Sequence, residues 1–148
     1  LLWVQRRQGI GPKEMERALD RESGLLGLAG TADMREVIAA ASRGAERMVL
    51  ALDVYIHRLA GSIAAMAAAL GGLDALVFTG GVGEHAPVVR ERACATAAFL
   101  GVDLDPALNA AGEADTVVSR SGAAAAVVLV AAREDIEMAH QVREALAD

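Results

Sequence analysis

The most informative stretch of the chain is a short apolar run followed by a glycine-rich segment: Leu73-Asp74-Ala75-Leu76-Val77-Phe78-Thr79-Gly80-Gly81-Val82-Gly83-Glu84-His85. The part from Leu73 to Thr79 is mostly apolar and β-prone, which predicts a buried central strand. Pro87 follows two residues after this stretch and fits the first turn of a helix, where its missing N–H is not needed. The sequence therefore predicts a strand, a glycine-rich turn and a helix that continues to about Leu100.

Helices alternate with apolar runs along the rest of the chain. The strongest helical pattern lies between Gly44 and Leu70, where apolar residues recur at steps of three and four. Ser23–Gly30 is predicted as an apolar, glycine-containing loop. Further helices are predicted over 1–8, 12–21, 33–43 and from about 133, and strands over 102–104, 116–119 and 126–131. This alternation predicts an α/β protein with one domain.

The composition excludes several classes of protein. Of the 148 residues, 54% are hydrophobic and 23% are charged, which excludes intrinsic disorder and suffices for a sizeable core. The net charge of −6 and the aromatic content of 3% argue against nucleic acid as a partner. The longest uncharged run, 59–73, is shorter than the about 20 residues that span a bilayer, so no membrane partner is expected. The single cysteine, Cys94, fits a reducing compartment and is predicted to be a small core residue.

The glycine-rich turn is the first candidate site. Glycines let a backbone approach a ligand closely, and free N–H groups at the start of a helix favour anions. A tight turn without any ligand explains the same residues about equally well. Gly81–Ala86 also fits the dinucleotide pattern G-x-G-x-x-A, with Asp103 and Asp105 about 20 residues further on. A Rossmann-type dinucleotide-binding module is therefore an open alternative.

Two further candidates lie at predicted helix starts. A carboxylate and a guanidinium two residues apart, Asp33 and Arg35, have the chemistry to hold a ribose and flank a base. From the residues alone, an N-cap at Asp33 with Glu36 in a near capping box is favoured. Glu134 follows a predicted strand and has the chemistry to hold Mg²⁺ through water. From the residues alone, a favourable interaction of the Glu134 carboxylate with the helix dipole is the preferred explanation.

Taken in chain order, these segments resemble the acetate kinase family. The central stretch is similar to the family's D-A-[IL]-V-F-T-[AG]-G-I-G-E-N, and it is followed by a similar Pro-x-Val-Arg-Glu at 87–91. The remaining segments that resemble family motifs are Ser23–Leu28 (S-G-L-L-G-[LI]), Ala32–Val37 (D-[FLM]-R-[DE]-[IV]), Phe99–Asp105 (F-L-G-[IV]-x-[IL]-D) and Val127–Ala139, which is similar to the strand and Asn-Glu-Glu stretch before the family's last helix.

The resemblance implies an actin-like ATPase fold, with residues 1–148 forming part of its C-terminal nucleotide-binding domain. It implies a reversible transfer of the γ-phosphoryl of ATP to acetate, giving acetyl phosphate and ADP, in a cytoplasmic enzyme that forms a homodimer. It implies Mg²⁺ associated with Glu134. The residues that it implies for the adenosine pocket are Asp33, Met34 and Arg35 along the adenosine, and Gly81, Val82, Gly83, Glu84 and His85 on the other side.

The sequence departs from the family pattern in three places. His85 stands where the family usually has Asn, and Ala132-Arg133 stands where it usually has Thr-Asn. The chain begins Leu1-Leu2-Trp3-Val4, which we interpret as the middle of a helix, so we expect the catalytic residues upstream of Leu1 and no turnover by these 148 residues alone. A propionate or butyrate kinase of the same family and a non-catalytic nucleotide-binding fragment stay open as alternatives.

Overall fold

The computed structural model describes residues 1–147, and it describes side-chain surroundings for residues 1–146. Within it the chain divides into two compact units, Leu1–Arg58 and Leu59–Asp148. The long helix α5 (Glu46–Leu70) contains the boundary. The strands all lie in the second unit, and the two units are described separately below.

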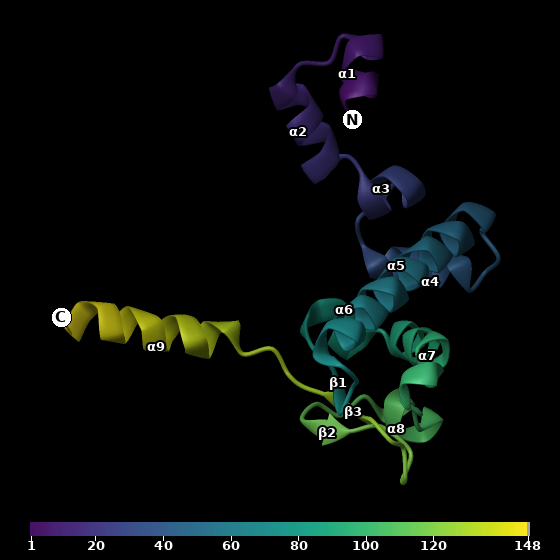
Figure 1. Ribbon diagram of the computed structural model, residues 1–148, viewed down its shortest axis with the longest axis vertical. Coiled ribbons are helices and arrows are strands. Elements are labelled where there is room, and N and C mark those ends of the chain that lie inside the picture. The colour runs from purple at the N-terminus through teal and green to yellow at the C-terminus, as the bar shows by residue number, and fades with distance from the viewer. Residues whose placement is uncertain (148) are drawn as a thin grey trace. The chain divides into compact units, whose positions relative to one another are not determined.

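The first unit is helical. It contains α1 (Leu2–Gln8), α2 (Pro12–Arg21), α3 (Gly24–Ala29), α4 (Met34–Ala41) and the first half of α5 (Figure 1). Four of these five confirm predicted helices. The predicted loop over 23–30 is wrong, because its middle forms α3.

Two contacts explain why α3 forms despite its glycines. Gly30 takes a φ of 83° at its C-cap, a left-handed conformation that glycine adopts without strain. The Nε of Arg47 donates a hydrogen bond to the carbonyl oxygen of Leu28 at 2.6 Å, which satisfies a carbonyl that the helix leaves free. The loop was predicted from local propensity, and a residue 19 positions away overrides it.

The second unit is built on a three-stranded sheet of order β1-β3-β2. Strand β3 (Ala126–Leu129) lies in the middle, parallel to β1 (Ala75–Phe78) and antiparallel to β2 (Thr116–Val117). The strand predicted at 73–79 exists, but its predicted central, buried place is wrong: β1 is an edge strand among the described residues, and Val77 is 52% exposed. An apolar sequence indicates that a strand can be buried. It does not indicate whether the strand pairs with one strand or two, because that depends on the rest of the fold.

Helices and connections fill the remainder of this unit. They are α6 (Gly80–His85), α7 (Pro87–Thr96), the 3-10 turn η1 (Ala98–Leu100), α8 (Pro106–Ala111) and α9 (Glu134–Ala147). The helix predicted over 87–100 is confirmed, with its last turn tightened into η1. Two predictions are wrong: the glycine-rich turn is itself the helix α6, and the strand at 102–104 is reduced to two isolated bridges. The sequence analysis did not predict α8, which Asp105 caps by accepting hydrogen bonds from the N–H groups of Ala107 and Leu108.

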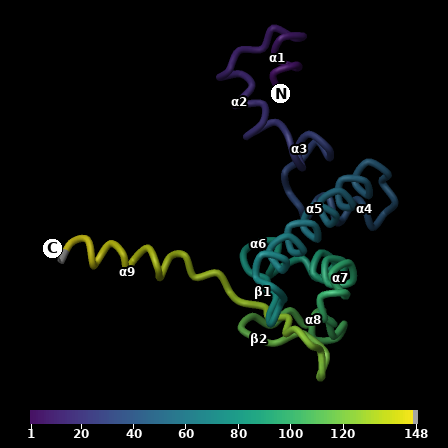
Figure 2. The backbone as a smooth tube through the Cα atoms, viewed as in Figure 1, coloured from purple at the N-terminus to yellow at the C-terminus, as the bar shows by residue number. Residues whose placement is uncertain are grey.

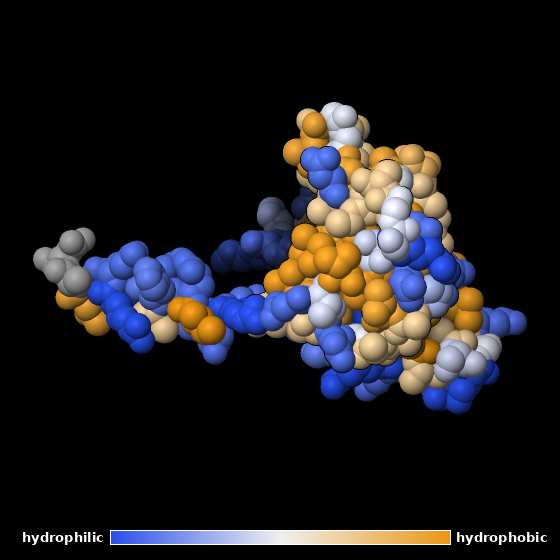
Figure 3. Space-filling model, turned by 90° about the horizontal axis from the view of Figure 1, so that it is seen from below, coloured by the Kyte–Doolittle hydropathy of each residue, from blue (hydrophilic) through white to orange (hydrophobic). Residues whose placement is uncertain are grey.

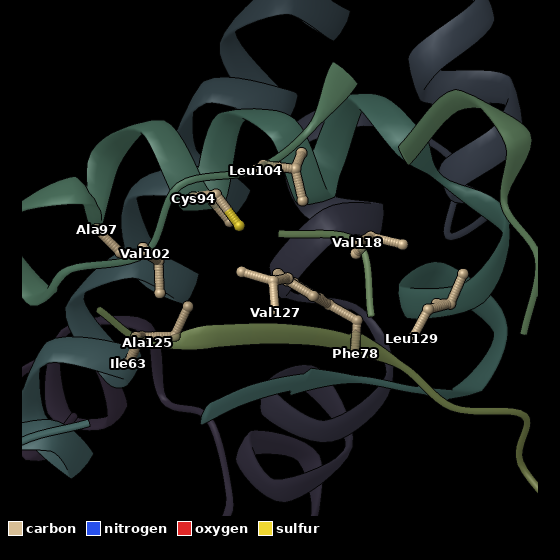
Figure 4. Packing of buried hydrophobic residues seen from close by; sticks show 11 residues of the cluster. Ile63, Phe78, Cys94, Ala97, Val102, Leu104, Val118, Ala125, Val127 and Leu129 are labelled. Atoms are coloured by element: carbon tan, nitrogen blue, oxygen red, sulfur yellow. The ribbon is translucent and has the colours of Figure 1, made fainter. Parts of the chain in front are cut away.

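The core of the second unit lies between the sheet and α7. Figure 4 shows Val127 of β3 below Cys94 of α7, with Phe78 of β1 and Leu129 of β3 farther along the same cluster. The prediction that Cys94 is a core residue is confirmed, since its side chain is 2% exposed. Burial raises the pKa of its thiol to about 11, so the thiol stays protonated at neutral pH and is not a nucleophile.

Helix α9 forms where the sequence predicts it, but its apolar side chains are not covered. Figure 2 shows the backbone of α9 running clear of the sheet, and Figure 3 shows apolar residues on its surface among hydrophilic ones. Ile136, Val142 and Leu146 are all exposed.

One helix among the described residues, α5, is long and apolar enough to cross a bilayer by length and composition alone. This is weak evidence, because core helices of soluble proteins meet the same criterion.

Candidate functional site

Asp33 and Arg35 form a tight local pair at the start of α4. The backbone N–H of Arg35 donates to Oδ1 of Asp33 at 2.9 Å, so Asp33 is the N-cap. The Arg35 guanidinium also donates to both carboxylate oxygens, through Nε at 3.0 and 3.2 Å and through Nη2 at 2.6 Å. These hydrogen bonds lower the pKa of Asp33 to about 2. The capping interpretation of Asp33 therefore describes its contacts in the structure.

The same pair leaves chemistry available to a ligand. The Arg35 side chain is 87% exposed, so a face of its guanidinium plane is open to stacking by a base. The intervening Met34 has a buried side chain, so only its backbone is available to a ligand. All three residues belong to the first unit.

The glycine-rich segment forms α6, immediately after β1. Its helix consists of Gly80-Gly81-Val82-Gly83-Glu84-His85, so half of its residues are glycine. A Cβ added at Gly83 would lie 3.3 Å from the carbonyl carbon of Phe78, a tight contact that would require a small shift of the backbone. A Cβ added at Gly81 would meet nothing within 4 Å. Gly81 therefore faces open space, whereas Gly83 packs against the end of β1.

Glu84 connects α6 to the segment that leads into α9. Its Oε1 accepts a hydrogen bond from the backbone N–H of Ala132 at 3.0 Å, across 48 residues of sequence. Two stretches that the sequence singled out, the glycine-rich run and the start of the last helix, are thereby brought together. The neighbouring His85 is exposed and makes no hydrogen bond or ion pair with the residues that the structure describes.

Glu134 is the first residue of α9, and its side chain is exposed without a hydrogen-bonding or ionic partner in the described part of the chain. Arg133 does not compete for it, because the Arg133 guanidinium pairs with both carboxylate oxygens of Asp115. Those hydrogen bonds hold the pKa of Asp115 below its usual range. Asp115 also accepts from the N–H of Ala131 at 3.3 Å, which anchors the segment before Glu134.

The fit of Mg²⁺ rests on this free carboxylate. Residues 1–147 contain no group of three or more His, Cys, Asp or Glu side chains arranged to hold a metal ion. Mg²⁺ is usually bound by one or two carboxylates together with water and phosphate oxygens. Glu134 fits that pattern as one ligand, with the other ligands supplied from outside these residues.

The sequence analysis assigned no role to three residues that hold α6 and the start of α9 in place: Arg90, Asn109 and Asp115. The side chain of Arg90 is 0% exposed, and its guanidinium donates to carbonyl groups of α6 and α8. A signal for it was present, since Arg90 shares the helical face of Ala93, Cys94 and Ala97, which are all buried. A charged residue at a buried helical position indicates a specific partner.

The comparison with known proteins decides the family. Residues 1–140 match the family model described as the Acetokinase family. The chain belongs to this family. An acetate kinase of Leifsonia xyli subsp. xyli is 45% identical over 148 residues, which cover 99% of this chain and 37% of that relative.

Solved structures of family members share the fold. The crystal structure of a Porphyromonas gingivalis acetate kinase superposes with a TM-score of 0.88 and 32% identity, covering 98% of this chain and 37% of that one. A propionate kinase from Francisella tularensis superposes with a TM-score of 0.84 and 32% identity, over 91% of this chain and 34% of that one. The chain therefore has the α/β architecture of the acetate and sugar kinase/actin-like fold, and the Rossmann alternative is excluded. It spans about a third of the length of these family members.

Proposed function

We propose that residues 1–148 are part of the C-terminal nucleotide-binding domain of an acetate kinase. One observation in the structure carries this proposal within the family. Strands β1 and β3 are parallel neighbours in register, with Phe78 opposite Leu129, so the segments that follow them leave the same edge of the sheet. These segments are α6 and the start of α9, and Glu84 joins them. Ligands of open α/β sheets bind outside the carboxyl ends of the strands.

The proposed roles follow from the chemistry of each residue. The open backbone at Gly81 and the neighbouring Val82, Gly83, Glu84 and His85 contact the nucleotide from α6. In the first unit, Asp33, Met34 and Arg35 contact the adenosine, with the exposed Arg35 guanidinium stacked on the base. The low pKa of Asp33 keeps its carboxylate charged at every physiological pH.

Glu134 is the proposed metal-associated residue. Mg²⁺, when bound, neutralises phosphate charge during phosphoryl transfer. Asp115, by binding Arg133 and the N–H of Ala131, keeps the guanidinium away from the Glu134 carboxylate and holds the start of α9. None of the described residues is proposed as a catalytic residue. We expect the groups that stabilise the transferring phosphoryl to come from outside these 148 residues, in a cytoplasmic homodimer.

Acetate is the proposed acceptor because the curated relatives that match are named acetate kinases. A propionate kinase is the second candidate, since the Francisella tularensis propionate kinase superposes with a TM-score of 0.84 at the same 32% identity as the P. gingivalis acetate kinase. The segment described here therefore has the same fold in enzymes with different acyl acceptors. We propose that the choice of acyl group is made outside it.

The experiment uses the complete gene product that contains these residues. Acyl phosphate is trapped as a hydroxamate after incubation with Mg-ATP and acetate, propionate or butyrate, each over a range of concentrations. We expect acetate to give the highest kcat/KM. Thermal protection by ADP and not by NAD is the parallel binding test. Protection by NAD alone, or no acyl phosphate from any of the three acids, would contradict the proposed function.

A further inference from the structure

Arg90 is a fully buried cation in α7, and the groups that accept its hydrogen bonds are all uncharged. Its Nη1 donates to the carbonyl oxygens of Gly83 at 2.7 Å and Glu84 at 2.8 Å. Its Nε donates to Oδ1 of Asn109 at 2.7 Å, and its Nη2 donates to the backbone carbonyl of Asn109 at 2.8 Å. No carboxylate pairs with it among the residues that the structure describes. Four carbonyl dipoles therefore take the place that an acidic partner would normally occupy.

Burying a charged side chain costs free energy unless hydrogen bonds compensate for the lost water. The hydrogen bonds of Arg90 supply that compensation. Burial lowers the pKa of the Arg90 guanidinium, although it remains a cation at neutral pH. The carbonyls of Gly83 and Glu84 belong to the last turn of α6, where helical carbonyls lack partners within the helix. The negative end of the helix dipole lies there as well, and it favours a cation. Arg90 therefore acts as an external cap for α6.

Helix α6 depends on external support more than an ordinary helix does. It has six residues, and glycine is one of the least helix-favouring residues. Its Thr79 N-cap makes no side-chain capping hydrogen bond, and its C-cap residue is Ala86. Its external contacts include the packing of Gly83 against the end of β1, the hydrogen bond from Ala132 to Glu84 and the hydrogen bonds from Arg90.

Asn109 completes the arrangement from α8. Besides accepting from Arg90, its Nδ2 donates to the carbonyl oxygen of Pro87 at 3.0 Å, at the first residue of α7. One arginine and one asparagine thus connect α6, α7 and α8, which Figures 1 and 2 show as neighbours. Both side chains are buried, so neither is available to contact a nucleotide itself.

We infer that Arg90, held by Asn109, is a positioning residue that sets the backbone of α6 for nucleotide binding. The inference rests on the proposed function, since it assigns α6 to the nucleotide. It predicts a specific effect. Loss of the planar Arg90 guanidinium displaces the open backbone at Gly81 and weakens the binding of the nucleotide, while the binding of the acyl acceptor is unaffected. If Arg90 served stability alone, replacing it would lower the melting temperature and the yield of folded enzyme. It would not change the KM for ATP and the KM for acetate by different factors.

The test is steady-state kinetics of the complete gene product carrying Arg90→Lys, with KM measured separately for ATP and for acetate. Lysine keeps the charge but lacks the planar fork that reaches α6 and Asn109 together. We expect the KM for ATP to rise by about tenfold or more, since small displacements in a binding site have effects of that size. The KM for acetate should stay within about twofold. Arg120→Met is the matched control, because Arg120 is an exposed arginine of the same unit.

Asn109→Ala is the second variant, and it decides the question if Arg90→Lys does not fold. It removes the Oδ1 acceptor of Arg90 while leaving the cation in place. A raised KM for ATP at an unchanged KM for acetate supports the inference. Equal changes in both constants, or a change in neither, overturn it. The unmodified protein separates this result from the proposed function: if it makes no acyl phosphate, the function is wrong, whereas an active enzyme without the split contradicts only the role of Arg90.

Discussion

Two glycines of α6 offer a matched pair of substitutions, Gly81→Ala and Gly83→Ala. Neither glycine has a positive φ, so alanine is compatible with both backbones. In a helix, alanine is favoured over glycine by about 0.8–1.0 kcal/mol. The two positions differ in their surroundings, since a Cβ at 81 meets nothing within 4 Å and a Cβ at 83 lies 3.3 Å from the Phe78 carbonyl carbon.

The expected effects on folding have opposite signs. Gly81→Ala should raise the free energy of unfolding by up to about 1 kcal/mol. At position 83 the neighbour is backbone, and overpacking of that kind costs about 1–3 kcal/mol, which equals or exceeds the gain in propensity. Gly83→Ala should therefore destabilise by roughly 0–2 kcal/mol net.

Nucleotide binding adds a second readout to this pair. If α6 contacts the nucleotide as proposed, the new methyl group at Gly81→Ala occupies ligand space, so the more stable variant should bind ADP more weakly. The measurements are urea unfolding and calorimetric titration with ADP, on the complete gene product. Equal stabilisation by the two alanines would refute the packing argument. A more stable Gly81→Ala with unchanged ADP affinity would refute the contact between α6 and the nucleotide.

Three further predictions concern charge, metal and turnover. The pKa of Asp33 is lowered to about 2, so the charged carboxylate stabilises the fold above the unfolded-state pKa near 4. This stabilisation is lost as the pH falls from about 4 to 2. The free energies of unfolding of Asp33→Asn and of the unmodified protein should therefore differ at pH 5 and converge near pH 2. Asp33→Asn should also weaken ATP binding; because it keeps a capping side chain, its difference in stability from the unmodified protein should be small, and it should be the same at neutral pH as at pH 5. Glu134→Ala should raise the Mg²⁺ concentration for half-maximal activity, and superimposable normalised Mg²⁺ titrations would contradict the metal role. The 148-residue chain by itself should form no acetyl hydroxamate from Mg-ATP and acetate, whereas turnover at the 1–100 s⁻¹ typical of kinases would show that the active site lies within it.

The helices that were predicted correctly are those whose signals are local. Helix α5 follows from apolar residues at steps of three and four, and α7 begins at Pro87 as expected. Asp33 caps α4 through a backbone N–H only two residues away. The helices that were missed are short. Two of them, α3 and α6, accept hydrogen bonds from Arg47 and Arg90, which lie outside those helices. The third, α8, has a local N-cap at Asp105 that the sequence analysis did not use.

In the candidate site, too, local features could be predicted from the sequence and contacts between distant residues could not. The residue types and their order along the chain were enough to indicate the acetate kinase family and to select α6 and Glu134. They did not show that Glu84 binds the N–H of Ala132, or that Arg133 pairs with Asp115, because these partners are 48 and 18 residues apart. The helical face of Arg90 indicated that it is buried, but its acceptors lie on two other helices and did not follow from the sequence.

The amino-acid sequence alone was enough to predict the longer helices and the strands of the sheet, the prolines that begin helices, and the family that the chain resembles. These properties depend on side-chain periodicity and on backbone conformations that each residue permits locally. The tertiary structure decided that β3 and not β1 is the central strand, that a glycine-rich segment is helical, and that a buried arginine caps it. Those outcomes depend on burial and on hydrogen bonds between distant segments. Such interactions form only when folding brings their partners within a few ångströms and removes the water that would otherwise satisfy them.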